Sequence, residues 1–148
     1  MDSYLEEIFK TCGDGLSINF DQEWVIKTYY DYIGLFPMLA QTKYMVADEE
    51  NGKCKQIVFF MENEVARFAN DKFEIFPIKN RIKQISIDEL EFYNSDTRKN
   101  ISKLSLKLET DLGLVIELKE AGKRAKTEYL SKLLEGYLLP NLKQRIDQ

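Results

Sequence analysis

The 148-residue sequence contains no histidine, and this absence removes several kinds of chemistry. Histidine is the side chain best suited to move protons near neutral pH, and it is a common metal ligand. Without it, Ser-His-Asp and Cys-His catalytic arrangements cannot form within one chain. Neither a GxGxxG nor a GxxxxGK[ST] loop for nucleotides occurs. Carboxylates cluster at 48–50 and 88–91, where solvated turns and strand ends explain them. We therefore expect no enzyme activity, no catalytic residue, no metal and no cofactor.

Cysteine is also scarce, with Cys12 and Cys54 as the two examples. Two widely spaced cysteines make neither a disulfide framework nor a metal signature. Reduced thiols are typical of the cytosol. The N-terminus MDSYLEEIFK has no basic start and no apolar core of a signal peptide. No apolar run approaches the ~20 residues of a membrane-spanning helix. These features predict a soluble, cytoplasmic protein.

An excess of positive charge is missing as well. The chain has 21 basic and 25 acidic residues, and its formal net charge is -4. A non-specific nucleic-acid binder usually carries a positive excess, because neutralising phosphates supplies most of its affinity. We therefore expect no nucleic-acid partner. Hydrophobic residues make up 44% of the chain and aromatic residues 12%, which is enough for one folded core.

The first 42 residues predict two helices. Ser3 and Glu6 have the spacing of a capping box, and Gly13 begins the segment that ends this helix. Asp21 is a suitable N-cap for a second helix that ends near Gly34. The buried face of this second helix is predicted to consist of Ile26, Tyr29, Tyr30 and Ile33.

From residue 43 onward the pattern predicts about seven antiparallel strands followed by one helix. Asn51-Gly52 is a strong signal for a hairpin turn. The segment 77–94 is less regular, and we expect one helical turn, made by isoleucines of 78–85, that leads into a bent strand. A helix is predicted from Thr127, and Pro140 should break it. The predicted strands are 44–47, 55–61, 64–69, 73–76, the bent strand near 85–92, 103–108 and 112–118.

Three stretches are similar to those of bacterial pleckstrin-homology-like (PH-like) domains. They are the hairpin IVFFMENEVARFA, the segment FEIFPIKNRIKQISI, and LSLKLETDLGLVIELKEAG followed by TEYLSKLLEGYLL. The resemblance covers Lys43 to about Leu139, and the chain also resembles a small family of Gram-positive bacterial proteins. It implies an α+β fold in which a PH-like antiparallel β-barrel of about seven strands is capped by a C-terminal helix. Residues 1–42 would form a helical extension on that barrel, and 43–148 the barrel with its helix, in one compact unit.

The resemblance also implies a non-catalytic binding or scaffolding module. PH-like folds commonly expose a sheet edge, or a groove beside the terminal helix, where an extended peptide adds as a strand. The expected partner is therefore a protein or a peptide. Self-association through such an edge is a variant of this interpretation, because exposed strand edges invite pairing.

Peripheral binding to anionic membrane lipid is the alternative. Basic residues form three local sets, which are Lys79, Arg81 and Lys83, then Arg98 and Lys99, and then Lys123, Arg124 and Lys126 in the predicted loop Lys119–Lys126. The first turn between strands, DEENGK, is mostly acidic and would repel a lipid headgroup. The candidate residues for an anion or lipid contact are Lys123, Arg124, Lys126, Arg98 and Lys99.

Overall fold

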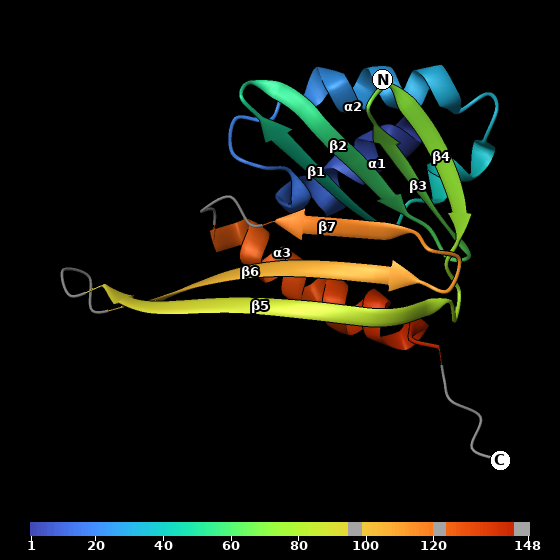
Figure 1. The fold of residues 1–148 in the computed structure, drawn as a ribbon. Coiled ribbons are helices and arrows are strands. Elements are labelled where there is room, and N and C mark those ends of the chain that lie inside the picture. Colours follow the sequence, from blue (N-terminus) through green and yellow to red (C-terminus); the bar gives the residue numbers. More distant parts are fainter. Residues whose placement is uncertain (95–98, 120–123, 144–148) are drawn as a thin grey trace, which may run out of the picture. The chain divides into compact units, whose positions relative to one another are not determined.

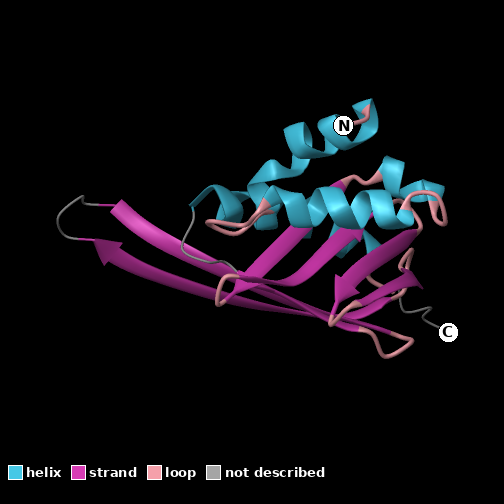
Figure 2. Ribbon diagram, turned by 90° about the horizontal axis from the view of Figure 1, so that it is seen from above, coloured by secondary structure: helices cyan, strands magenta, loops and turns pink. Residues whose placement is uncertain are grey.

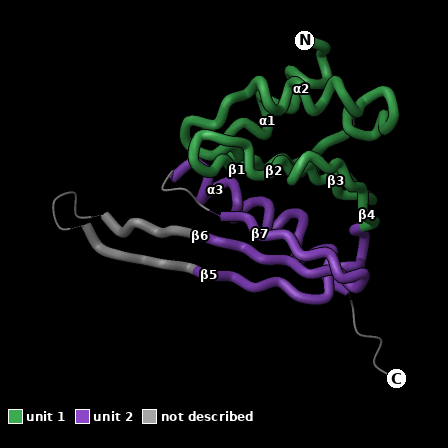
Figure 3. The backbone as a smooth tube through the Cα atoms, turned by 45° about the horizontal axis from the view of Figure 1, so that its top comes forward, with its two compact units in different colours: residues 1–77 green, residues 78–148 purple. Residues whose placement is uncertain are grey.

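A computed structural model describes the chain over residues 1–94, 99–119 and 124–143, and its side chains over 1–88, 104–119 and 124–143. The chain forms two compact units, Met1–Pro77 and Ile78–Gln148 (Figure 3). The predicted boundary at residue 42 separated the helices from the strands. The first compact unit contains both N-terminal helices and the first four strands.

The first unit is a four-stranded antiparallel meander with two helices on one face (Figures 1 and 2). Its strands pair in the order β1-β2-β3-β4, so β1 and β4 are the edge strands of this sheet. Tyr32 of the second helix contacts the rings of Phe68 and Phe73, which fixes the covered face. The elements are α1 (Ser3–Cys12), α2 (Gln22–Tyr32), β1 (Tyr44–Glu50), β2 (Lys53–Phe60), β3 (Glu64–Ala69) and β4 (Lys72–Pro77), with short 3-10 turns at Gly13–Gly15 and Pro37–Gln41.

Strand β2 forms the centre of the first unit. Its residues Ile57 to Phe60 are each 0% exposed, so both faces of the strand are buried. Alternating residues of a strand point to opposite faces, and a run of four apolar residues is what such a strand needs. The helices contribute side chains that are at most 2% exposed, namely Leu5, Ile8, Cys12, Val25 and Tyr29.

The predicted helices are confirmed, with two corrections in their detail. Asp2, rather than Ser3, caps α1, since its Oδ1 accepts a hydrogen bond of 2.8 Å from the Leu5 N–H. Val25, Thr28 and Tyr29 form the buried face of α2, whereas Ile26 and Ile33 are half-buried and Tyr30 is 45% exposed. Its hydroxyl oxygen instead accepts a hydrogen bond of 2.8 Å from the Asp2 N–H, which ties α1 to α2. Asp21 caps α2 as expected, through the Glu23 N–H at 2.9 Å.

The second unit is a three-stranded antiparallel sheet, β5-β6-β7, followed by helix α3. Leu106, Leu108, Ile116 and Leu118 are at most 2% exposed, and they form the dry face that the alternation predicts. The predicted helical turn within 78–85 is wrong, because Ile82 and Ile85 lie in β5. The elements are β5 (Ile82–Asn94), β6 (Lys99–Thr110), β7 (Val115–Lys119) and α3 (Arg124–Leu133).

The end of α3 shows how Pro140 changes the helix. Proline has no N–H and its ring clashes with the carbonyl four residues earlier, which is that of Gly136. The chain therefore widens into a π-helical turn over Leu134–Leu138 and ends in a 3-10 turn at Leu139–Asn141. Asn141 then accepts a hydrogen bond of 3.2 Å from the Asn80 N–H and donates one of 2.8 Å to the Tyr137 carbonyl.

Seven strands are present in the residues that the structure describes, as the sequence predicts, and the α+β class is confirmed. They form separate sheets of four and three strands. The closed barrel that the PH-like resemblance implies is therefore not confirmed.

The turn between β1 and β2 gives a direct test of the backbone assignment. Gly52 has φ +74, and a Cβ there would meet nothing within 4 Å. Alanine should therefore cost about 1 kcal/mol through backbone strain alone. We expect Gly52→Ala to lower the free energy of unfolding in urea by that amount. Gly13, with φ -59 and equally open surroundings, is the matched control, and Gly13→Ala should be neutral or stabilising. Equal effects of both substitutions would contradict this interpretation of the turn.

Candidate functional site

Two tight turns lie at the same end of the four-stranded sheet. They are Asn51-Gly52 between β1 and β2, and Asn70-Asp71 between β3 and β4. All four residues have positive φ, at 54, 74, 52 and 60 degrees in chain order. Two residues of this conformation form a type I′ turn, which suits the twist of a hairpin. Because the strands alternate in direction, both turns come to one end of the sheet.

The hairpin of β1 and β2 extends beyond the hairpin of β3 and β4, which leaves the first residues of β2 without a neighbour on the β3 side. Pairing between β2 and β3 begins at Gln56 and Ala69, so residues 53–55 extend beyond β3. On their other side they pair with β1 through Glu49–Cys54 and Glu50–Lys53, and the register shift at Asp48/Glu49 makes Lys55 a bulge. The overhang creates a hollow at the end of the sheet.

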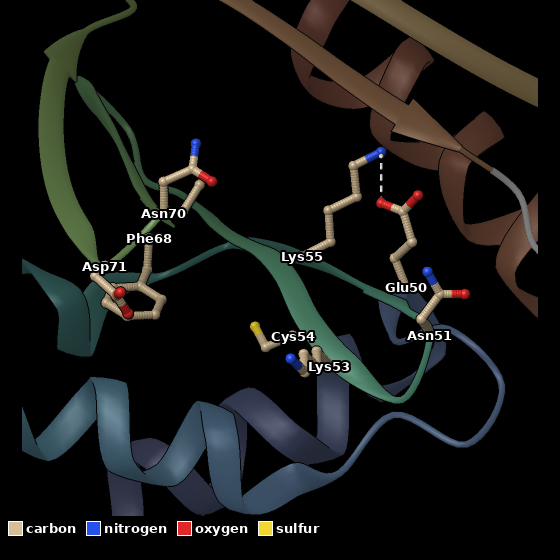
Figure 4. Close-up of a pocket in the computed structure, with 9 residues that line it drawn as sticks. Glu50, Asn51, Lys53, Cys54, Lys55, Phe68, Asn70 and Asp71 are labelled. Carbon is tan, nitrogen blue, oxygen red and sulfur yellow. Dashed lines mark ion pairs between the residues drawn. The ribbon is translucent and has the colours of Figure 1, made fainter.

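Figure 4 shows this hollow, which has a volume of about 530 Å³. Phe68, Cys54 and the turn Asn70-Asp71 line it. Lys55 and Glu50 also line it, and they pair with each other at 3.7 Å. A neighbouring hollow of about 440 Å³ opens between α2 and the sheet and shares Cys54, Phe68 and Asp71. Ligand pockets of similar size are usually mostly apolar and enclosed. The first hollow contains the ion pair Lys55–Glu50, and the second contains the pair Lys27–Asp31 and the contact of Tyr32 with Phe68.

The aromatic and charged groups of the second hollow pair in different ways. Tyr32 stacks on Phe73 with a centroid distance of 4.1 Å and an interplanar angle of 7°. Lys27 donates to Asp31 over 2.6 Å, and this hydrogen bond raises the pKa of the Lys27 ammonium. The ring stacking joins α2 to the sheet, whereas Lys27–Asp31 is an exposed pair within α2.

Cys54 has the position of a nucleophile but lacks the chemistry of one. Burial, followed by the negative charge of Asp48, raises the pKa of the Cys54 thiol from 9.0 to about 11. Reactive cysteines have lowered pKa values, since the thiolate is the reacting form. At pH 7 the thiolate fraction of Cys54 is on the order of 10⁻⁴. No group of three or more acidic or cysteine side chains in the described part of the chain could hold a metal ion.

The outer side of β4 is the remaining feature, and we call residues Lys72–Pro77 with their outward-facing backbone the β4 edge. Lys72, Glu74, Ile75 and Pro77 are exposed along it. Ala69 and Lys72 close the two-residue turn as a hydrogen-bonded pair. Such pairs alternate along an antiparallel ladder, so Lys72, Glu74 and Phe76 direct their backbone groups toward β3.

Phe73 and Ile75 therefore direct their N–H and C=O groups away from the sheet. No backbone group in the described residues pairs with them. Pro77 has no N–H and ends the edge. An edge of this kind is short, but it presents two donors and two acceptors in one row.

The side chains of the β4 edge divide by face. Phe73 and Ile75 lie on the face that α2 covers, and Ile75 remains 43% exposed. Lys72 and Glu74 lie on the opposite face, beside a hollow of about 350 Å³ that Arg67 also lines. Arg67 pairs with Glu74 at 3.8 Å, whereas Lys72 forms no ion pair with any residue that the structure describes.

The basic residues predicted to contact an anion are not assembled into one described site. Lys126 lies in α3 and is 0% exposed. Arg124 is exposed and pairs with Glu128 at 3.2 Å. Arg98 and Lys123 lie outside the described residues, and Lys99 begins β6 with its side chain outside them. The described residues therefore show one exposed basic group of this set, and it already has an acidic partner.

The sequence pattern predicts the strand 73–76 but does not show that this strand lies at the edge of its sheet. A signal was present, because Lys72 and Glu74 point to one face and Pro77 follows directly. Charged residues and proline are typical of edge strands. Which of the predicted strands is the last in its sheet depends on pairing, and that information comes from the structure.

Comparisons with known proteins give no further guide, since no family model, no curated protein and no solved structure matches this chain. In the part of the chain that is described, no helix is long and apolar enough to cross a membrane.

The state of Cys54 can be checked by its reaction with iodoacetamide. Because its pKa is raised to about 11, the alkylation rate should rise about tenfold per pH unit from pH 8 to pH 10 and level off only near 11. An ordinary cysteine levels off near its pKa of about 8.5. Cys54→Ser is the control, and it should not react in the native state because Cys12 is 0% exposed. A plateau below pH 9 would contradict the raised pKa.

Proposed function

We propose that this protein is a non-catalytic binding module that recognises an extended polypeptide by strand addition at the β4 edge. The observation that carries the proposal is the exposed row formed by the backbone groups of Phe73 and Ile75. A peptide that pairs there would complete their hydrogen bonds, as in other complexes formed by adding a strand to a sheet. The PH-like resemblance adds support, because folds of that type commonly expose a sheet edge, or a groove beside the terminal helix, where an extended peptide can add as a strand. The proposal does not depend on a closed barrel.

The energetics indicate what else the peptide must supply. Four backbone hydrogen bonds at about 1 kcal/mol each amount to about 4 kcal/mol, which corresponds to a dissociation constant of about 1 mM. Tighter binding needs side-chain contacts. Ile75 is 43% exposed and offers apolar surface next to Phe73, so apolar side chains on the α2 face of the added strand would contribute most.

The charges on the opposite face favour one peptide pattern. An acidic side chain fits opposite Lys72, and a basic one fits opposite Glu74. An antiparallel peptide runs in the opposite direction to β4. From its N-terminus to its C-terminus, its residues therefore lie opposite Ile75, Glu74, Phe73 and Lys72 in turn. The favoured sequence is therefore apolar, basic, apolar, acidic.

The location that we propose is the cytoplasm, in keeping with the free thiols of Cys12 and Cys54. The membrane alternative has less support than peptide binding. Of its five candidate residues, Arg124 is the one with a described, exposed side chain, and Glu128 neutralises it. A single exposed pair of this kind contributes little to attraction toward an anionic surface.

A displayed library of random hexapeptides, selected on the immobilised protein, tests the proposed function. We expect enrichment of the apolar-basic-apolar-acidic pattern. Ile75→Pro should weaken the binding of selected peptides at least tenfold, because it removes an outward donor while leaving the β3–β4 ladder intact. Ile75→Val is the matched control, since it keeps the N–H and a branched apolar side chain.

Circular dichroism and melting temperatures of both variants establish that the sheet is retained. Peptides that bind wild type and Ile75→Pro equally would refute strand addition at β4. A library from which nothing is enriched would refute the proposed function itself.

A further inference from the structure

We propose that the strand added at the β4 edge belongs to a second copy of this chain, an inference that rests on the strand addition proposed above. The two copies would pair β4 with β4 in antiparallel orientation, around a two-fold axis at Phe73. A two-fold interface is self-complementary, so each contact occurs twice. The result is a continuous sheet of eight strands, four from each copy.

The number of available registers is small. Backbone bonds across the axis require outward-facing residues to meet outward-facing residues, and on β4 these are Phe73 and Ile75. Three antiparallel registers satisfy this condition. Their two-fold axes pass through Phe73, through Glu74 or through Ile75.

The charges separate the three registers. With the axis at Phe73, Lys72 of each copy lies opposite Glu74 of the partner subunit, which gives two opposite-charge pairs. With the axis at Glu74, more backbone bonds form, but the two Glu74 carboxylates face each other. With the axis at Ile75, Phe73 meets Pro77, which has no N–H to donate, and Lys72 has no acidic group opposite.

The register centred on Phe73 also matches three of the four positions of the peptide pattern derived from the edge, while the position opposite Ile75 is taken by Asp71 rather than by an apolar residue. Three consecutive positions of that pattern are basic, apolar and acidic. In the second copy these positions are filled by Lys72, Phe73 and Glu74, in the required order. The β4 edge therefore fits its own sequence, and its exposed lysine, which has no ion partner in the described residues, gains one.

The side chains nearest the axis support the same arrangement. Phe73 stacks on Tyr32 of its own helix at 4.1 Å, so its position on the α2 face is fixed before association. Little ordering is then needed at the centre of the contact, which lowers the entropic cost of association. The contact is short, so the dimer should be weak and concentration-dependent.

Sedimentation equilibrium from about 10 μM to about 1 mM protein tests this inference, since a small interface associates in that range. Wild type should show a reversible monomer–dimer equilibrium. Lys72→Glu should weaken the dimer at least tenfold, because the new glutamate of each copy would then lie opposite Glu74 of the other copy. Lys10→Glu makes the same charge change at an exposed site on α1 and should leave association unchanged.

Charge exchange supplies the decisive comparison. An equimolar mixture of Lys72→Glu and Glu74→Lys should form a heterodimer at least tenfold more stable than either homodimer, because both pairs again join opposite charges. Lys72→Glu is the primary variant, since Glu74→Lys also removes the internal partner of Arg67. Melting temperatures check that both variants remain folded.

The outcomes distinguish the two proposals. A wild-type protein that stays monomeric throughout the range overturns the second-copy inference, and selected peptides that bind in an Ile75-dependent manner would then still support the proposed function. A dimer that is insensitive to Lys72→Glu overturns the register centred on Phe73. Failure of both peptide binding and association overturns both proposals.

Discussion

The hydrogen-bonded pair between Ala69 and Lys72 determines what the first unit presents to its surroundings. Once a two-residue turn closes on this pair, the alternation of an antiparallel ladder assigns a direction to every backbone group of β4. Asn70 and Asp71 can form that turn because asparagine and aspartate tolerate positive φ better than most residues. A turn longer by one residue would reverse the assignment and point Phe73 and Ile75 toward β3. The external chemistry of the sheet therefore depends on the two turn residues Asn70 and Asp71.

Much of the fold follows from local pattern, and the failures have physical causes. Asp21 and Asn51-Gly52 act through their own backbone neighbours, so their roles in a cap and a turn are predictable from the sequence. The isoleucines of 78–85 were misassigned because spacings of four and three fit a helix as well as a loop followed by a strand. Helical spacing predicts that Tyr30 is buried. Its hydroxyl oxygen instead accepts a hydrogen bond from the N–H of Asp2, which lies 28 residues earlier in the chain.

The candidate site was less predictable than the fold. Whether a strand is central or at an edge depends on which strands pair, and the antiparallel periodicity of β3 and β4 is the same in either case. Lys126 shows the opposite error, since a lysine in the basic run KEAGKRAK was expected in an exposed loop and lies buried in α3. A long aliphatic stem allows lysine to pack among apolar groups, and composition alone does not reveal this.

The π-helical turn before Pro140 affects where the end of the second unit lies. A wider turn places one additional residue in the helix without adding a full turn, so every later residue is rotated by roughly 100° relative to a regular helix. This rotation brings Leu142 beside Ile82 as a parallel bridge, and Asn141 to the Asn80 N–H. The proline that interrupts the helix thus also determines which side chains of residues 139–143 face the start of β5.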